Sequence, residues 1–328
     1  MIYLGSYTAG SGEGVGVATV RDGALRLEST AACPPRPSYL ALAPDGRTLY
    51  AAHELEAGLV SAFAIDERGE PRLLGTQPCG GAEPCHLSVH PSGRFVLSAH
   101  WGSGSIAVQP IDGEGLVGPP TDMVEQSKRY AHMVVTDPAG RWVLVVYLGA
   151  GTVSTYHLDL GSGRFELRNE AQLHAGAGPR HLAFHPDGAT VYVVNELDST
   201  VTACGFEAES GRLTPGATVR TLPEETVGEN YPSAIRVAPD GRFVYVGNRG
   251  HDSIGVLSTE PSLRLVATHP SGGEFPRDLA FSRDGRLLWI ANERADRIVG
   301  LAVDPTDGSL SPTNLSLQLP KPTCVLPA

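Results

Sequence analysis

The stretch that decides the fold is SAIRVAPDGRFVYVGNRGHDSIGVL, from Ser233 to Leu257. A short run of alternating apolar residues leads into the turn Ala-Pro-Asp-Gly, and a run of β-branched and aromatic residues follows it. Alternation with a period of two, interrupted by a Pro-Asp-Gly turn, is typical of two antiparallel strands joined by a tight turn. A Gly- and Asp-rich loop and a third alternating run come next, so the stretch predicts three consecutive strands.

The same pattern occurs six times along the chain. The six copies begin at Ser38, Cys85, His132, Arg180, Ser233 and Arg277. The glycine of the turn recurs about every 47 residues, which is a period typical of repeat architectures. These glycines are Gly46, Gly93, Gly140, Gly188, Gly241 and Gly285. A chain of 328 residues has room for a seventh unit. We expect that unit to be split, because the C-terminal PTCVLPA reads as its first strand and the N-terminal IYLGSYTAGSGEGVGVATV as its second and third.

A fourth, more polar strand follows the third in each unit, and no amphipathic helix is predicted anywhere. Seven units of four strands indicate an all-β fold, a seven-bladed β-propeller of four-stranded antiparallel blades, with one blade closed by both chain termini. We expect residues 1–328 to form this one domain, with the closing blade shared by residues 1–32 and 321–328. Such closure removes the exposed edges that an open array would leave. The alternative of an irregular pair of β-sandwiches fits the period less well, and the absence of a Trp-Asp dipeptide disfavours the WD40 class.

Composition excludes several classes of protein. The formal net charge of −11 disfavours binding to nucleic acid or to an anionic membrane surface, because phosphates would be repelled over most of the surface. No apolar run is long enough for a membrane span, and the start MIYLGSYTAG has no signal-type segment, so we expect a cytoplasmic protein. The five cysteines form no Cys-x-x-Cys pair, which predicts reduced thiols rather than disulfides or structural zinc.

Antiparallel pairing predicts which residues ring one end of the propeller axis, here called the mouth. The first strand of each blade would begin there and the second would end there, while the Pro-Asp-Gly turns would lie on the opposite face. The first-strand starts are the six residues given above, with Thr323 for the split blade. The second-strand ends are His53-Glu54, His100-Trp101, Tyr147-Leu148, Asn195-Glu196, Asn248-Arg249, Asn292-Glu293 and Ser6-Tyr7. These positions differ from unit to unit while the turns hardly vary, which indicates an end adapted for function.

The residue types at the mouth suit a small anionic substrate. Guanidinium groups, here Arg180 and Arg249, grip carboxylate or phosphate, and imidazole or carboxylate can move a proton near neutral pH. We expect no metal, because the histidines come from separate units and arginines beside them would repel a cation. We also expect no cofactor, and a monomer or a weak homo-oligomer. No Gly-x-Ser-x-Gly motif is present, so nothing points to a serine nucleophile.

At these residues the chain resembles the seven-bladed propeller lactonase family, which includes propeller-type 6-phosphogluconolactonase and the 3-carboxy-cis,cis-muconate cyclase. The resemblance spans nearly the whole chain and is most specific in GPRHLAFHPDG (178–188), VNELDSTV (194–201), VGEN (227–230) and SAIRVAPDGRFVYVGNRGHDSI (233–254). It implies a cofactor-independent lactonase of carbohydrate metabolism that hydrolyses a small acidic lactone such as 6-phosphogluconolactone. It also implies the catalytic residues by motif. These are His132 in AHMVVTDP, Arg180 in GPRHL, Glu196 in VNEL and Arg249 in NRGHDS.

Further residues are expected to bind the substrate, and some depart from the family pattern. They are His86, His100, Trp101, Tyr147, His181, His251 and Arg277. The departures are Tyr130, His53, His100-Trp101 and Tyr147, where the family often has other residues. Two alternatives therefore stay open: a cyclase or isomerase of the muconate-lactonising type acting on a carboxylate, and a non-catalytic YVTN-like binding propeller. The longest interval between turn glycines contains TLPEETVGENYPSA (221–234), which we expect on the mouth face, where it could partly cover the pocket.

Overall fold

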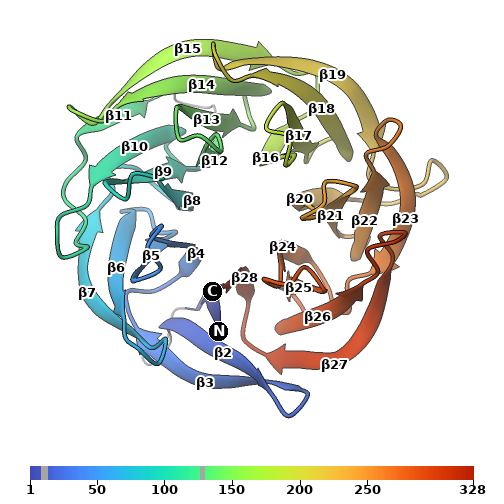
Figure 1. Ribbon diagram of the computed structural model, residues 1–328, viewed down its shortest axis with the longest axis horizontal. Coiled ribbons are helices and arrows are strands. Elements are labelled where there is room, and N and C mark those ends of the chain that lie inside the picture. Colours follow the sequence, from blue (N-terminus) through green and yellow to red (C-terminus); the bar gives the residue numbers. More distant parts are fainter. Residues whose placement is uncertain (9–13, 126–129) are drawn as a thin grey trace.

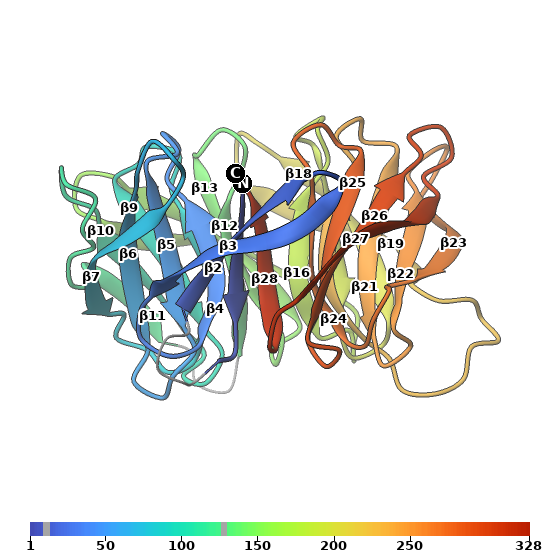
Figure 2. The ribbon, with the colours of Figure 1, turned by 90° about the horizontal axis from the view of Figure 1, so that it is seen from below.

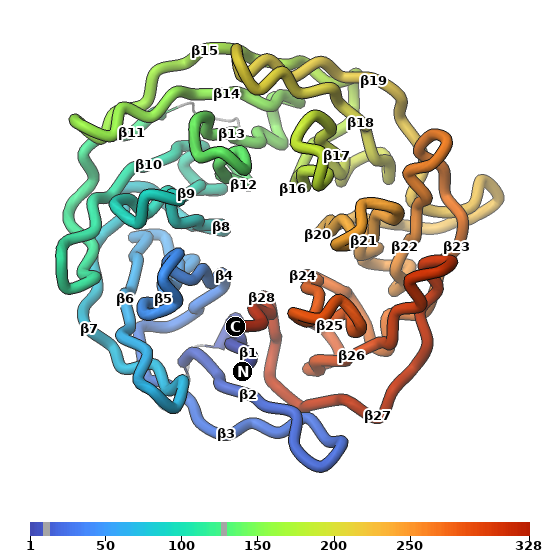
Figure 3. The backbone as a smooth tube through the Cα atoms, viewed as in Figure 1, coloured from blue at the N-terminus to red at the C-terminus, as the bar shows by residue number. Residues whose placement is uncertain are grey.

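The computed structural model describes residues 1–8, 14–125 and 130–328. The described residues form twenty-eight β-strands and no helix, arranged as seven four-stranded antiparallel sheets. Figure 1 shows these sheets as blades placed in a ring, with the first strand of each blade innermost. The smooth trace in Figure 3 shows the same ring, with the two chain ends side by side in one blade. The predicted seven-bladed propeller is therefore confirmed.

The blades are numbered from the first complete one, and each contains four consecutive strands. Blade one is β4 (Pro37–Leu42), β5 (Thr48–His53), β6 (Leu59–Ile65) and β7 (Pro71–Pro78). Blade two is β8 (Pro84–Val89), β9 (Phe95–His100), β10 (Ser105–Pro110) and β11 (Asp122–Glu125). Blade three is β12 (Ala131–Thr136), β13 (Trp142–Tyr147), β14 (Thr152–Asp159) and β15 (Arg164–Gln172). Blade four is β16 (Pro179–Phe184), β17 (Thr190–Asn195), β18 (Thr200–Glu207) and β19 (Arg212–Arg220).

The remaining blades follow the same order, and the last combines both ends of the chain. Blade five is β20 (Tyr231–Val237), β21 (Phe243–Arg249), β22 (Ser253–Ser258) and β23 (Arg264–Pro270). Blade six is β24 (Pro276–Phe281), β25 (Leu287–Asn292), β26 (Arg297–Val303) and β27 (Leu310–Gln318). Blade seven is β28 (Pro322–Pro327), β1 (Ile2–Ser6), β2 (Gly14–Arg21) and β3 (Ala24–Ala32). Because β28 pairs antiparallel with β1, the ring is closed by both chain ends, as the repeat period predicts.

The turn between the first and second strand explains the glycine of the repeat. The six predicted turn glycines all have positive φ, from 67° at Gly140 to 81° at Gly241. Residues with a Cβ rarely adopt this left-handed region, whereas glycine enters it freely. These turns lie on the face of the ring opposite the mouth. In Figure 2 they lie at the top, and both chain ends are labelled there.

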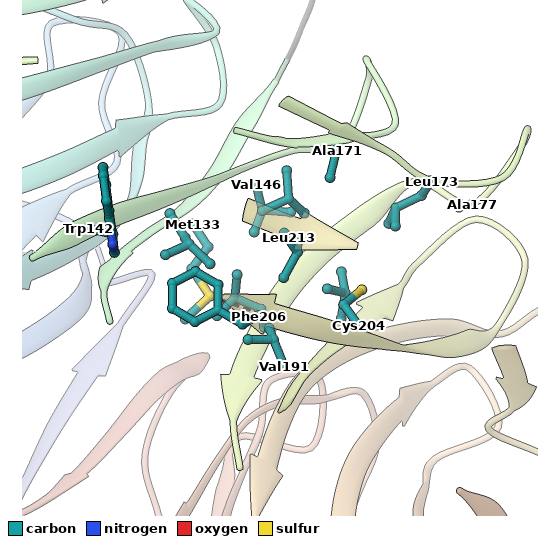
Figure 4. Close-up of a cluster of buried hydrophobic side chains, with 14 residues drawn as sticks. Met133, Trp142, Val146, Ala171, Leu173, Ala177, Val191, Cys204, Phe206 and Leu213 are labelled. Carbon is teal, nitrogen blue, oxygen red and sulfur yellow. Dashed lines mark hydrogen bonds between the residues drawn. The ribbon is translucent and has the colours of Figure 1, made fainter. Parts of the chain in front are cut away.

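Apolar side chains fill the space between neighbouring blades. Figure 4 shows one such cluster, in which Met133, Trp142 and Val146 of blade three meet Val191 and Phe206 of blade four. Removing this apolar surface from water is the main stabilising contribution in a fold of this kind. An aromatic residue of the second strand adds a directional contact by donating to the next blade. Trp142 Nε1 donates to the Ala208 carbonyl at 2.8 Å, and Tyr245 OH donates to the Gly308 carbonyl at 2.9 Å.

The segment between β19 and β20 is the long insertion anticipated from the sequence. Figures 1 and 2 show that it projects outward from the outer edge of the ring and not over the axis. Its Val227 side chain is 92% exposed. The expectation that it could cover the pocket is therefore wrong, because the segment extends away from the axis.

Candidate active site

A β-bulge at the start of each innermost strand turns side chains toward the axis. In β16, Pro179 pairs with Asn195 and His181 pairs with Val194, so Arg180 is an extra residue without a partner across the strand pair. The same shift occurs at His132 and at Arg277. Successive side chains of a regular strand point to opposite faces, whereas a bulge re-aims one of them. Arg180 and His181 are consecutive, yet both line the same cavity on the axis.

The end of each second strand divides its two residues between the blade and the mouth. Asn195 is fully buried and donates to the hydroxyls of Thr200 and Thr202 at 2.8 and 2.9 Å. The next residue, Glu196, has a side chain that is 20% exposed and lies at the mouth. In this pair, the first residue therefore holds the blade together, and the side chain of the second is available to contact a substrate at the mouth.

Blades four and five contribute a cluster of two arginines and one glutamate. Arg249 Nη2 lies 2.7 Å from Glu196 Oε2, and Arg180 Nε lies 3.1 Å from the same oxygen. Arg249 Nε also donates to the Tyr231 carbonyl at 2.8 Å, which fixes the guanidinium. Burial and the neighbouring Arg180 lower the pKa of Arg249 to about 9, while Glu196 opposes the shift. Arg249 therefore carries its charge at neutral pH, in surroundings where a charge interacts strongly.

Arg180 retains donor groups for a guest. Its side chain is 3% exposed, and its Nε and Nη1 have no hydrogen-bond partner among the described residues. The contact of Nε with Glu196 is thus an ion pair without the angle of a hydrogen bond. Buried donors without partners are costly, so these groups suit an acceptor that a substrate brings.

A second cluster lies on the other side of the axis, on blades six, seven and one. Arg277 Nη1 donates to Glu293 Oε2 at 3.3 Å, and Arg277 Nη2 lies 4.0 Å from Glu54 Oε2 and donates to Tyr7 OH. Tyr7 OH in turn donates to Glu54 Oε2 at 2.7 Å. The sequence analysis placed Tyr7, Glu54 and Glu293 at the mouth but assigned only Arg277 to substrate binding. The signal was present, because these three residues occupy the same repeat position as Glu196 and Arg249.

Three buried histidine rings pack against one another beside the axis of the ring. The ring of His181 lies between those of His86 and His132, with centroids 5.5 and 5.2 Å apart and edge-to-face angles of 82° and 68°. Burial, followed by the nearby Arg180, holds the pKa of His132 and His181 well below the usual range, so both imidazoles are neutral at pH 7. The rings pack edge to face. Within residues 1–8, 14–125 and 130–328, no group of three His, Cys, Asp or Glu side chains could hold a metal ion.

A small polar cavity of about 10 Å³ lies where these clusters meet. It is lined by Ser38, Tyr39, Glu54, Cys85, Arg180, His181, Arg277, Asp278 and Thr323. Several buried atoms of this lining have no hydrogen-bond partner among the described residues, namely Ser38 Oγ, Arg180 Nη1 and both ring nitrogens of His181. A volume of this size holds about one water molecule. A larger hollow of about 900 Å³ is lined by turn residues of the opposite face, among them Asp45 and Asp112, and by none of these titratable groups.

A deeper ion pair was not foreseen. Arg236 Nη2 donates to Asp278 Oδ1 at 2.9 Å, and Asp278 Oδ2 accepts from the Val325 backbone at 3.0 Å. Asp278 is 2% exposed. It follows the bulged Arg277, so the same local geometry that brings His181 to the channel also brings Asp278 there.

The structure does not bring every expected substrate-binding residue to the mouth. His100 is fully buried inside blade two, between the hydroxyls of Ser98 and Ser105 at 2.9 and 2.8 Å. Tyr147 is likewise buried, with its hydroxyl 3.2 Å from that of Tyr156.

Two more of the expected substrate-binding residues, Trp101 and His251, lie in loops. Trp101 stacks on Tyr130 at 4.8 Å, 41% exposed, and His251 bonds to Ser253 Oγ at 2.8 Å in an exposed loop. Of the expected binding residues, His181 and Arg277 line the cavity, and His86 packs against His181.

Comparison with known proteins identifies the family of the chain. The family model described as "Lactonase, 7-bladed beta-propeller" matches residues 1–327. The 6-phosphogluconolactonase of Bacillus subtilis is 34% identical over 270 residues, covering 77% of this chain and 76% of the relative. That of Pectobacterium carotovorum is 34% identical over 230 residues, covering 69% of this chain and 68% of the relative.

Solved structures of gluconolactonases resemble this chain over nearly its whole length. A periplasmic gluconolactonase of Pseudomonas aeruginosa superposes with a TM-score of 0.91 and 28% identity, covering 99% of this chain and 97% of the other. A structure titled as a putative 6-phosphogluconolactonase of Bacteroides uniformis has a TM-score of 0.91 and 28% identity, covering 99% and 98%. Within the described part of this chain, no helix is long and apolar enough to cross a membrane.

Proposed function

This chain belongs to the seven-bladed β-propeller lactonase family and is a lactonase, and we propose that its substrate is a small lactone carrying an anionic group, such as 6-phosphogluconolactone, bound at the mouth. One observation supports the location of the substrate site at the mouth. Arg180, Glu196 and Arg249, from three strand ends in two blades, meet within 3.1 Å at the edge of a polar cavity lined by buried atoms without partners. The substrate named for the relatives supports this choice.

The two arginines divide the binding between them in this proposal. Arg249 holds the phosphate or carboxylate of the substrate, because its guanidinium is fixed by Tyr231 and Glu196. Arg180 donates from Nη1 to the lactone carbonyl oxygen and stabilises the oxyanion that forms there. Removing one such donor typically lowers kcat by about 10²–10³-fold.

Glu196 is the group that we assign to remove the proton from the attacking water. Both arginine contacts fall on its Oε2, so Oε1 takes the proton. The water oxygen bonds to the carbonyl carbon, the ring carbon–oxygen bond breaks, and the alkoxide takes the proton from Glu196 to give the hydroxy acid. His132 is 6% exposed, and burial, followed by the nearby Arg180, disfavours its imidazolium form. We therefore give it a positioning role beside Arg180.

An assay of the purified protein tests the function. We expect it to accelerate the loss of 6-phosphogluconolactone well above the spontaneous rate, with release of one acid equivalent per lactone. Formation of a lactone from a muconate-type carboxylate, without hydrolysis, would instead favour the cyclase alternative. A rate equal to the spontaneous one for every acidic lactone would leave the binding propeller as the better description.

Arg249→Ala tests the anion clamp. We expect KM for 6-phosphogluconolactone to rise by about tenfold or more, because a charge-assisted bond contributes about 1.5–3 kcal/mol. Initial rates over a range of substrate concentrations give the value, with Glu209→Gln, a change of an exposed residue on blade four, as the control. An unchanged KM would rule out this role for Arg249.

A further inference from the structure

The two clusters at the mouth are complementary in chemistry. On blades four and five, two guanidiniums share one carboxylate. Across the axis, one guanidinium, Arg277, is shared by two carboxylates and a phenol. We call the second group, Tyr7, Glu54, Arg277 and Glu293, the acidic half of the mouth.

Both halves open onto one space. Glu54 and Arg277 line the same 10 Å³ cavity as Arg180 and His181. The side chains of Glu54 and Glu293 are 15% and 17% exposed, so each carboxylate is held among buried groups and still reaches the surface of the mouth. A guest bound to Arg180 therefore has the acidic half within reach of its far side.

The acidic half is held rigidly. Although burial opposes it, contact with Tyr7, Glu54 and Glu293 raises the pKa of Arg277, so its charge is permanent. Burial, together with the hydrogen bond to Glu54, raises the pKa of Tyr7, which therefore stays a neutral phenol. Its ring also lies under the guanidiniums of Arg277 and Arg36, at 4.7 and 4.8 Å from the centroid. Arg36 stacks on this ring and forms no ion pair with a carboxylate among the described residues.

Ionised carboxylates accept hydrogen bonds and donate none. Two of them at one wall of a pocket suit hydroxyl groups and oppose a second anion. The buried Ser38 Oγ and the ring nitrogens of His181, which have no partner among the described residues, add polar groups on the floor between the two halves. An apolar guest would leave Ser38 Oγ and the His181 ring nitrogens without a partner, which is unfavourable for buried polar groups.

We propose that the acidic half is a hydroxyl-binding subsite, in which Glu54 and Glu293 accept from the ring hydroxyls of a polyhydroxylated lactone whose anionic group lies on Arg180 and Arg249. The proposal rests on the lactonase site described above and adds its specificity: the mouth reads a sugar lactone in one orientation. Glu54 and Glu293 are then specificity-determining residues that take no part in proton transfer.

Three lactones and two isosteric variants test it. The probes are 6-phosphogluconolactone, glucono-δ-lactone and δ-valerolactone, which differ in the anionic group and in the hydroxyls. For Glu54→Gln and Glu293→Gln we expect kcat/KM to fall by about tenfold or more for both hydroxylated lactones, because a site built for hydroxyls discriminates strongly between substrates with and without them. The value for δ-valerolactone should change by less than about twofold. Glu209→Gln is the control for all three.

The outcomes separate this proposal from the function itself. If the wild-type protein hydrolyses no lactone, the proposed function fails and the subsite fails with it. If the wild type is active and both variants lose activity equally on all three lactones, the function stands and the subsite is wrong. A selective loss on the two hydroxylated lactones supports it.

A binding measurement on the wild type does not depend on the variants being folded. Calorimetry should show D-gluconate bound at least about tenfold more tightly than 5-hydroxypentanoate, which has the same charge and fewer hydroxyls. Equal affinities would overturn the proposal.

Discussion

At the scale of single residues, the neighbours Asn195 and Glu196 have different roles: the first stabilises the blade, and the second lies in the proposed active site. Asn195 ties the end of β17 to β18 through two threonines, and Glu196, the next residue, meets two guanidiniums. In the proposed reaction, this carboxylate accepts the proton of the attacking water.

Glu196→Gln and His132→Ala test the two candidate proton carriers. If Glu196 takes the proton from water, Glu196→Gln lowers kcat by about 10²–10⁴-fold. His132→Ala lowers it as well, but less, because a positioning residue is removed and the base remains. Turnover numbers for 6-phosphogluconolactone, measured at saturating substrate, decide between them.

Near-wild-type turnover in both variants would contradict the assignment of either residue to the reaction.

At the scale of elements, the bulge and the turn at opposite ends of each inner strand have separate tasks. The bulge at Arg180 turns two consecutive side chains toward the channel. The turn at the other end only reverses the chain, and its glycine adopts a φ near 70°. Changes in the turns should therefore affect stability and not catalysis.

Gly188→Ala and Gly140→Ala test this separation. A Cβ at Gly188 would meet no atom within 4 Å, so only the positive φ of 69° acts, at a cost of roughly 1–2 kcal/mol. Gly140→Ala should cost more, because its Cβ would lie 3.1 Å from Pro91 Cγ. Urea unfolding gives both values. The kcat/KM of each folded variant should stay within about twofold of the wild type, and a larger loss would argue against a site at the mouth.

At the scale of the whole molecule, the ring is tied together across blades near its closure. Asp278 of blade six binds Arg236 of blade five and accepts from Val325 of blade seven. One buried carboxylate thus joins three blades beside the strand that completes the ring.

Asp278→Asn removes the charge with little change in shape. It leaves Arg236 beside a neutral amide, and breaking a buried ion pair costs about 3–5 kcal/mol. Since the Arg236 side chain is 25% exposed, we expect a smaller loss, of about 2–3 kcal/mol in the free energy of unfolding. Asp284→Asn, in an exposed turn of the same blade, is the control. Equal stability of the two variants would show that the pair contributes nothing to the ring.

Buried histidines give the molecule a defined dependence of stability on pH. Burial lowers the pKa of His86 to about 3 and that of His100 to about 4, against about 6.5 in the unfolded chain. Below pH 6.5 the unfolded chain binds the extra protons, so stability falls as the pH falls. Each histidine contributes about 1.4 kcal/mol per pH unit to this slope, and none above pH 6.5.

His100→Asn isolates one of these contributions. Asparagine occupies the same repeat position in blades four, five and six, as Asn195, Asn248 and Asn292, so the variant should fold. The free energy of unfolding, measured at pH 7.5, 6 and 5, should fall less steeply below pH 6.5 than in the wild type, by about 1.4 kcal/mol per pH unit. An unchanged slope in His100→Asn would contradict a neutral buried imidazole.

The sequence by itself determined the ring, its seven blades and the end at which the variable residues gather. These follow from period-two alternation, the turn glycine and the repeat length. All three are local properties of the sequence, and they recur in each unit. Those local patterns also placed Arg180, Glu196 and Arg249 at one mouth. They could not tell that His100 and Tyr147 face into their blades, because a pattern of pairs does not say which member of a pair points inward.

Only the tertiary structure decided which charges meet. The bulges at Arg180 and Arg277 turn their following residues, His181 and Asp278, into the channel, against the alternation that a strand pattern assumes. The contact of Arg277 with Tyr7 joins residues at opposite ends of the chain, and that of Arg249 with Glu196 joins two blades. Side chains from different repeats come together because the ring closes, and distances across a ring are set by its curvature and not by the spacing of residues along the chain.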